Sequence, residues 1–125
     1  MIKVLLVALG GAIGSVFRYL TGAAMLAVFP KSFPVGTLLV NIVGAFIIGV
    51  VSEFAYKVTP IHSSLYVFVT IGILGGFTTF SSFSLESVNM LEVGRVAAGA
   101  AYILASVVLS LGGVLLGKML IRGLY

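Results

Sequence analysis

Long apolar stretches alternate with short polar loops along this chain. The apolar stretches cover about residues 2–28, 35–54, 64–90 and 96–120. Each reaches the roughly 20 apolar residues that a helix needs to cross the hydrocarbon core of a bilayer. Proline, glycine and charged residues concentrate between the stretches, as is typical of loops. The pattern predicts an all-α membrane protein with four transmembrane helices. It also predicts that residues 1–125 form a single domain, since the spans and loops use the whole length.

The composition agrees with this interpretation. Hydrophobic residues make up 61% of the 125 residues, charged residues only 8%, and the mean hydropathy is +1.30. So few charges cannot cover the surface of a water-soluble domain. The net charge of +4 lies in loops and at helix ends, which favours contact with lipid headgroups over nucleic acid. Cysteine is absent, which excludes disulfides and thiol catalysis.

Near the N-terminus, Lys3 is followed by an apolar run, and this combination also resembles a signal peptide. A retained first helix is the preferred interpretation, because the rest of the chain is equally apolar and Arg18 interrupts the run. Gly10, Gly14, Arg18 and Gly22 are spaced four apart, so they share one helix face and allow another helix to approach closely. Arg18 is interpreted as a snorkelling or carbonyl-capping residue; the alternative is a cation that attracts anions at a vestibule.

The third apolar stretch contains an unusual segment, residues 72–86, which reads GILGGFTTFSSFSLE. Paired glycines weaken a helix, and Thr and Ser hydroxyls compete for backbone partners. The segment therefore predicts a helix that breaks near residues 75–79 and resumes near Phe80. At membrane depth such a break is tolerated only where protein or water shelters the freed backbone groups. Broken helices direct these groups at ions, so the segment is a candidate ion site.

The other polar side chains expected at depth are mainly hydrogen-bond donors. They are Asn41, Thr78, Thr79, Ser81, Ser84, Tyr102, Ser106 and Ser110. Asn41 is equally well explained as interhelical glue or as a donor that lines a polar path. The hydroxyls on the fourth stretch recur every four residues and form one stripe, which fits an ion-facing track or interhelical bonding. Donors together with the positive edges of Phe80 and Phe83 suit an anion that trades its hydration shell for hydrogen bonds.

No set of residues typical of an enzyme is visible. The sequence has one histidine, His62, in a loop, and lacks a phosphate-binding motif in the right context. Only Glu86 is expected to lie deeper in the membrane, while Glu53 and Glu92 flank loops. This shortage of buried carboxylates argues against a proton-coupled exporter, which is kept as an alternative. A noncatalytic membrane subunit, whose polar stripes only bind partner helices, is the other alternative.

Four spans place both chain ends on one side of the membrane. The Lys and Arg residues are divided so evenly between the two sides that the orientation is weakly specified. A weak bias permits insertion in both directions, and four helices enclose little space by themselves. The sequence therefore predicts a pore between subunits and, as a hypothesis, an antiparallel dimer.

Three motifs resemble the Fluc/CrcB family of fluoride channels. Residues 10–19, GGAIGSVFRY, are similar to the family pattern GGxxGAxxRY, and residues 36–44, GTLLVNIVG, are similar to GTLxVNxxG. Residues 75–84, GGFTTFSSFS, are similar to GGxTTFSTFS. Ser15 and Ser82 replace the usual Ala and Thr, which are small-for-small changes. The resemblance covers nearly the whole chain.

The resemblance implies an antiparallel, dual-topology homodimer with two fluoride pores, each lined by both subunits. It implies that Asn41 is a pore donor, that Phe80 and Phe83 meet fluoride, and that Ser81 and Ser84 are neighbouring pore hydroxyls. The stripe on the fourth helix corresponds to the family's polar track. The carbonyls of Gly75 and Thr78 would hold a structural Na⁺ at the dimer interface, and Arg18 matches the motif arginine. The implied role is passive fluoride export across the plasma membrane of a microbe, the inner membrane in bacteria.

Overall fold

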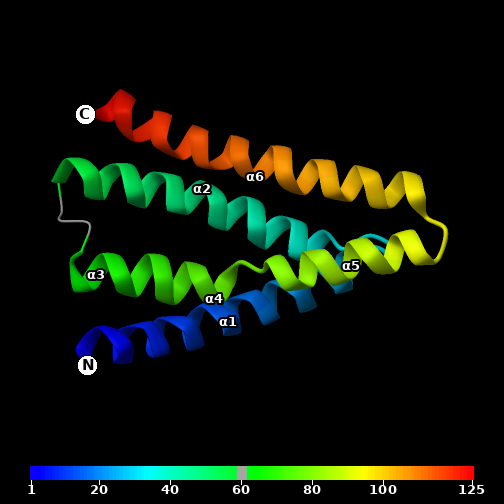
Figure 1. Ribbon diagram of the computed structural model, residues 1–125, viewed down its shortest axis with the longest axis horizontal. Coiled ribbons are helices and arrows are strands. Elements are labelled where there is room, and N and C mark those ends of the chain that lie inside the picture. Colours follow the sequence, from blue (N-terminus) through cyan, green and yellow to red (C-terminus); the bar gives the residue numbers. More distant parts are fainter. Residues whose placement is uncertain (59–61) are drawn as a thin grey trace.

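The computed structural model describes residues 1–58 and 62–125. The chain makes four long helical passes in alternating directions, and both termini lie at the same end of the molecule (Figure 1). The first, second and last passes are α1 (Ile2–Val28), α2 (Val35–Val58) and α6 (Val96–Leu124). The third pass, Ser64–Glu92, consists of several shorter helices. All four passes are long and apolar enough to cross a membrane, which confirms the predicted all-helical membrane fold.

The second pass is longer than predicted. The sequence suggested that the helix ends near residue 54 and that a loop covers residues 53–63, but α2 continues to Val58. Glu53 is therefore a helical residue, and only 7% of it is exposed. The Arg122 guanidinium donates to both of its carboxylate oxygens, over 3.0 and 3.2 Å, and Lys118 lies 3.6 Å away. This pairing explains how a carboxylate continues an apolar helix. Pro60, predicted to mark the loop, lies outside the described residues.

The loop predicted over residues 91–95 is also shorter, because Leu91 and Glu92 belong to the preceding helix and α6 begins at Val96. Gly94 supplies the turn with a φ of 82°, a left-handed conformation that glycine adopts without strain. At its other end α6 continues to Leu124, four residues past the predicted end at 120. No strand occurs within residues 1–58 and 62–125.

The third pass is built from α3 (Ser64–Val67), η1 (Phe68–Leu74), α4 (Gly75–Phe77) and α5 (Phe80–Glu92). The Ser63 side chain caps its start by accepting from the Tyr66 amide at 3.1 Å. The segment η1 is a π-helix, which the sequence pattern did not predict. Thr78 and Thr79 are extended, with ψ angles of 158° and 116°, and the Thr79 hydroxyl caps α5 by accepting from the Ser82 amide at 3.1 Å.

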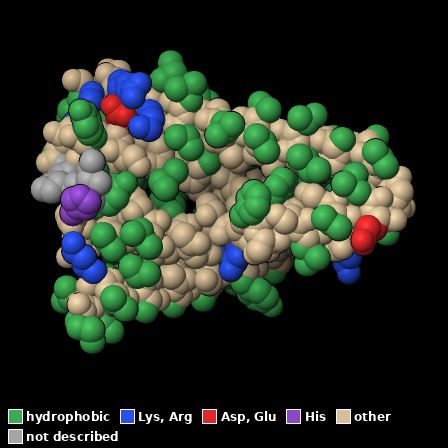
Figure 2. Space-filling view, in the orientation of Figure 1, with side chains coloured by type: hydrophobic (Ala, Val, Ile, Leu, Met, Phe, Trp, Pro, Cys, Tyr) green, Lys and Arg blue, Asp and Glu red, His purple; other side chains and the backbone are tan. Residues whose placement is uncertain are grey.

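The four passes form two closely packed pairs. In the first pair, α1 lies against η1 and α4, and a Cβ on Gly14 would overlap the Ile73 carbonyl oxygen. In the second pair, α2 lies against α6, and a Cβ on Gly117 would overlap the Phe46 carbonyl oxygen. Such backbone-to-backbone approach is how membrane helices associate without a hydrophobic driving force. Figure 2 shows that the surface between the two pairs is hollowed near the middle of the molecule.

Candidate ion pathway

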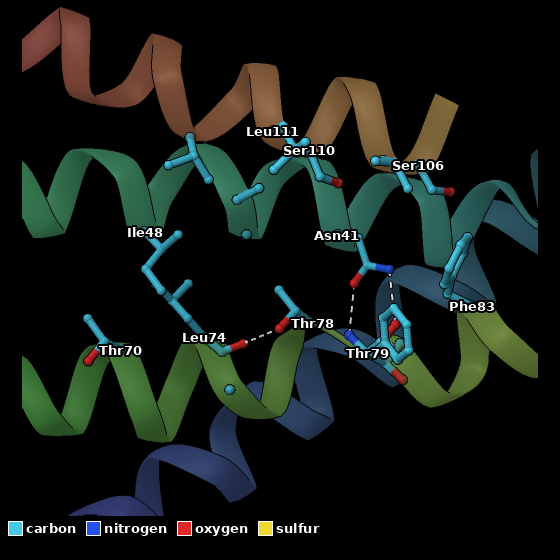
Figure 3. Close-up of a pocket in the computed structure, with 16 residues that line it drawn as sticks. Asn41, Ile48, Thr70, Leu74, Thr78, Thr79, Phe83, Ser106, Ser110 and Leu111 are labelled. Carbon is cyan, nitrogen blue, oxygen red and sulfur yellow. Dashed lines mark hydrogen bonds between the residues drawn. The ribbon is translucent and has the colours of Figure 1, made fainter. Parts of the chain in front are cut away.

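A groove with a volume of about 470 Å³ separates the two helix pairs. Residues of α2 and α6 form one wall, and residues of η1, α4 and α5 form the other (Figure 3). All of its lining side chains are uncharged. The groove brings together eight of the residues singled out in the sequence: Asn41, Gly75, Thr78, Thr79, Phe80, Phe83, Ser106 and Ser110.

Asn41 ties the second helix to the extended segment of the third pass. Its Nδ2 donates to the Thr79 carbonyl oxygen at 3.0 Å, and its Oδ1 accepts from the Thr79 amide at 2.8 Å (Figure 3). The side-chain amide thus replaces two backbone partners that a continuous helix would have supplied. Asn41 is both interhelical glue and a lining residue of the groove, so the two interpretations of this residue do not exclude each other.

The extended segment leaves two backbone carbonyls without their helical donors. In a continuous helix the Thr79 amide would donate to the Gly75 carbonyl, and the Ser82 amide to the Thr78 carbonyl. Here Asn41 takes the first amide and the Thr79 hydroxyl takes the second. Gly75 and Thr78 both line the groove, so these oxygens belong to groove residues.

Thr78 is fixed by its own short-range contacts. Its Oγ1 donates to the Leu74 carbonyl at 2.9 Å, which is shown in Figure 3, and its backbone amide donates to the same carbonyl at 3.0 Å. A Cβ on Gly44 would overlap the Thr78 methyl group, so α2 passes directly against this residue. Two residues of α2, Asn41 and Gly44, therefore contact the extended segment.

Four aromatic rings follow one another from the groove toward the end of the molecule that carries the loop between α5 and α6. The ring of Phe80 lies 5.5 Å from Phe83, Phe83 lies 5.5 Å from Tyr102, and Tyr102 lies 5.6 Å from Phe33. Phe80 is 79% exposed, whereas Tyr102 is completely buried. The row therefore begins on an open face of the groove and continues into the protein interior.

Glu86 lies beside this row, and hydroxyl groups donate to both of its carboxylate oxygens. One carboxylate oxygen accepts from the Tyr102 hydroxyl at 2.7 Å, and the other accepts from the Thr37 hydroxyl at 2.8 Å. Tyr102 was predicted to continue the hydroxyl stripe of Ser106 and Ser110, but it is absent from the groove lining and binds Glu86 instead. Thr37 was not among the predicted donors, although it lies four residues before Asn41 on the same helix face.

The Ser106 hydroxyl is the exception among the buried hydroxyls. Ser106 lines the groove and is 6% exposed, yet within the described part of the chain its hydroxyl makes no hydrogen bond. Leaving a buried hydroxyl without a partner is unfavourable, so a ligand or a water that reached this group would be stabilised by it. Ser110, one turn further along α6, also faces the groove.

Two predicted pore hydroxyls lie outside the groove lining. The Ser84 hydroxyl donates to the Phe80 carbonyl of its own helix at 2.9 Å. The Ser81 hydroxyl lies 3.4 Å from the Thr79 hydroxyl, at the start of α5. Neither residue contributes to the groove of this single chain. Their roles stay predictions.

Arg18 lies in a different cavity, on the other side of the extended segment. This cavity of about 320 Å³ is also lined by Ser15, Thr37, Thr79 and Ser82. Arg18 is half-buried, and four of the other lining residues of this cavity carry hydroxyl groups of Ser or Thr. The position fits both interpretations of this arginine, as a depth-fixing residue or as a cation beside a polar cavity.

The fold and the groove define a small multi-pass membrane protein whose polar groups are gathered between two helix pairs. Comparison with known proteins identifies its family. The family described as CrcB-like protein, Camphor Resistance (CrcB), matches residues 5–118, so the chain belongs to the CrcB family and the resemblance found in the sequence is confirmed.

Relatives match over almost their full length. A protein of Agrobacterium fabrum named fluoride-specific ion channel FluC is 49% identical over 100% of both chains. Proteins with the same name from Rhizobium etli and Ruminiclostridium cellulolyticum are 48% and 42% identical, over 99% and 98% of this chain and 99% and 94% of their own.

Proposed function

We propose that this protein is a channel, not an enzyme, and that it conducts fluoride passively out of the cytoplasm. Its family and the names of its relatives support the ion, and the groove supports the mode of transport. The observation that carries the proposal is the buried, unbonded Ser106 hydroxyl in an uncharged groove. A conducting ion must be bound well enough to enter and weakly enough to leave, which neutral donors achieve better than fixed charges.

The proposed path for fluoride follows the groove. Asn41, through its remaining amide hydrogen, and the hydroxyls of Ser106 and Ser110 would replace part of the hydration shell. Phe80 and Phe83 would contribute their positive ring edges. Thr79 would act mainly through its backbone, which Asn41 holds in place.

The proposed assembly is an antiparallel, dual-topology homodimer in the inner membrane of a bacterium. Two features support it: Phe80 is 79% exposed at the groove although it is large and apolar, and Gly75 is exposed beside it. A second copy in the opposite orientation would cover this face. Ser81 and Ser84 would then lie near the pore of the dimer, and lipid would cover the remaining apolar surface.

The proposed cofactor is a structural Na⁺ at the dimer interface. Its ligands would be the carbonyl oxygens of Gly75 and Thr78 from both subunits, and the donor set fits this group because both carbonyls have lost their helical donors to side chains. Within residues 1–58 and 62–125 no three His, Cys, Asp or Glu side chains are grouped as metal ligands. Backbone oxygens suit a hard monovalent cation.

Efflux from liposomes that contain only the purified protein tests the function. Fluoride- and chloride-selective electrodes would follow both ions under a K⁺ shunt and without a proton gradient. Rapid fluoride loss without chloride loss is expected. Fluoride movement only under a proton gradient would point to the exporter, and no movement from a well-folded protein would point to a partner-binding subunit.

A further inference from the structure

A loop far from the groove in sequence is connected to it by ring contacts. The loop of residues 29–34 joins α1 to α2, and its Phe33 packs edge-on against Tyr102, with ring planes 86° apart. Phe83, a lining residue of the groove, packs against Tyr102 at an interplanar angle of 48°. Tyr102 is completely buried, so its ring is held between a loop residue and a groove residue.

Phe33 contacts both the Tyr102 ring and an adjacent cavity. A cavity of about 250 Å³ lies at this end of the molecule, lined by Phe33, Thr37 and Glu86 among others. Phe33 packs on the Tyr102 ring and also lines this space, whereas Tyr102 does not line it. Without the ring, Tyr102 could relax toward the cavity, weaken its bond to Glu86 and release Phe83 from its position.

A second loop holds Phe33 in place. The Arg95 guanidinium donates through Nη1 to the carbonyl oxygen of Ser32, the residue before Phe33. Arg95 lies directly before α6, the helix that also carries Tyr102. Arg95, which bonds the loop, and Tyr102, which contacts Phe33 of that loop, therefore both belong to α6 and its N-cap.

We propose that Phe33 is a positioning residue for fluoride conduction and that the Arg95–Ser32 hydrogen bond keeps it in position. Phe33 fixes Tyr102, and Tyr102 fixes Phe83 and the Glu86 carboxylate. With these groups held, the wall of the groove has a defined shape at Phe83. Phe33 itself does not line the groove. The proposal rests on the proposed fluoride conduction, because its effect is measured as flux.

The test compares fluoride efflux from liposomes for wild-type protein, four single variants and one double variant. Phe33→Leu keeps an apolar side chain but removes the ring, and it is expected to lower the efflux rate about tenfold, as expected for an aromatic pair beyond its burial. Phe33→Tyr retains the ring and is expected to conduct nearly as well as wild type. Phe29→Leu is the matched control, since Phe29 is an exposed aromatic residue of the same loop. It should leave the rate unchanged.

The fourth variant, Arg95→Gln, removes the guanidinium that donates to Ser32, and a double variant with Phe33→Leu shows whether Arg95 acts through Phe33. Arg95→Gln is expected to lower efflux about threefold in the wild-type background and to have no further effect in the Phe33→Leu background, because the two residues act on one ring. An equal effect in both backgrounds would show that Arg95 acts independently of Phe33 and would overturn the assigned role of the bond. If Phe33→Leu does not yield folded protein, Arg95→Gln alone tests the proposal, and an efflux rate equal to that of wild type would overturn the role of the bond.

Two further outcomes separate this proposal from the proposed function. If wild-type protein conducts fluoride and Phe33→Leu conducts equally well, the positioning role is wrong and fluoride conduction stands. If wild-type protein conducts no fluoride, the proposed function fails, and with it the basis of this inference. Loss of flux in Phe33→Tyr as well as Phe33→Leu would also contradict the role of the ring.

Discussion

The α2–α6 pair and the third pass are both apolar enough to cross a membrane, but the third pass is less hydrophobic and satisfies its backbone groups in a different way. In the pair, both helices are continuous, their glycines bring the backbones together, and one ion pair closes the end at Glu53. The third pass changes from π-helix to α-helix, becomes extended at Thr78 and Thr79, and begins again at Phe80. The pair satisfies its own backbone, whereas the third pass depends on side chains from elsewhere.

The difference shows where a membrane protein can place polar groups. In this groove the rigid wall carries the side-chain donors Asn41, Ser106 and Ser110, and the irregular wall carries two backbone carbonyls without helical donors. The helix α2 contacts elements of both walls: Gly49 packs against α6, and Asn41 forms hydrogen bonds with the extended segment of the third pass. Changes at the glycine contacts between α2 and α6 should therefore affect stability, and changes at groove-lining polar residues should affect fluoride flux.

The largest expected effect is on the rigid pair. Gly117→Ala would place a Cβ over the Phe46 carbonyl oxygen and 2.8 Å from the Val50 nitrogen. Neither backbone atom can move aside cheaply, so a loss of about 1–3 kcal/mol or more is expected. Gly112→Ala is the matched control on the same helix, because its Cβ would meet nothing within 4 Å. Thermal aggregation in detergent measures both, and equal midpoints would mean that the pair is loosely packed.

The next effect falls on the junction between the two regions. Asn41→Ala removes both hydrogen bonds to the Thr79 backbone and should destabilise the protein by about 1–2 kcal/mol. It should also lower fluoride efflux at least about tenfold, since a groove donor is lost with the bonds that hold the break. Asn89→Ala on exposed α5 surface is the control. An Asn41→Ala protein with normal flux would refute any need for this amide.

A smaller effect is expected at the closed end of the pair. Glu53→Gln weakens the contact with Arg122 and Lys118, so the thermal midpoint should fall, though less than in Gly117→Ala. Fluoride efflux per folded protein should stay unchanged, because Glu53 lies outside the groove. Glu92→Gln removes a carboxylate that is exposed, and it should change neither quantity. Reduced flux in folded Glu53→Gln would show that the two regions are more closely coupled than the fold suggests.

The helical passes and the close glycine contacts could be predicted from the sequence because both depend on local patterns. Apolar length sets a membrane pass, and a spacing of four sets a face, as Gly10 and Gly14 confirm by packing against η1. The prediction that the second helix ends at residue 54 was wrong because a contact distant in sequence was not visible. Glu53 continues the helix because Arg122, 69 residues away, pairs with it.

The sequence predicted many of the residues that line the groove, but not the hydrogen bonds that these residues and their neighbours form. Polar residues at depth identified Asn41 and Ser106, since such residues are costly unless they have a purpose. The register between helices decides which hydroxyl meets which acceptor, and sequence spacing does not contain it. Tyr102 was therefore assigned to the stripe although it binds Glu86, and Phe33 gave no signal in its loop. The π-helix was missed because its residues are as apolar as those of an α-helix.

The smallest effect on stability is expected for Ser106→Ala. This variant should also separate stability from fluoride efflux most clearly. The Ser106 hydroxyl makes no hydrogen bond within the described residues, so its removal breaks nothing and should leave the thermal midpoint unchanged or slightly raised. Fluoride efflux should nevertheless fall about three- to tenfold, because one donor of the groove is lost. Ser87→Ala is the matched control: Ser87 is also 6% exposed, but its hydroxyl donates to the Phe83 carbonyl of its own helix at 2.7 Å. That variant should keep its flux. If the two serines proved equal in flux, the free hydroxyl would be a packing defect, and conduction would depend on Asn41 and the rings.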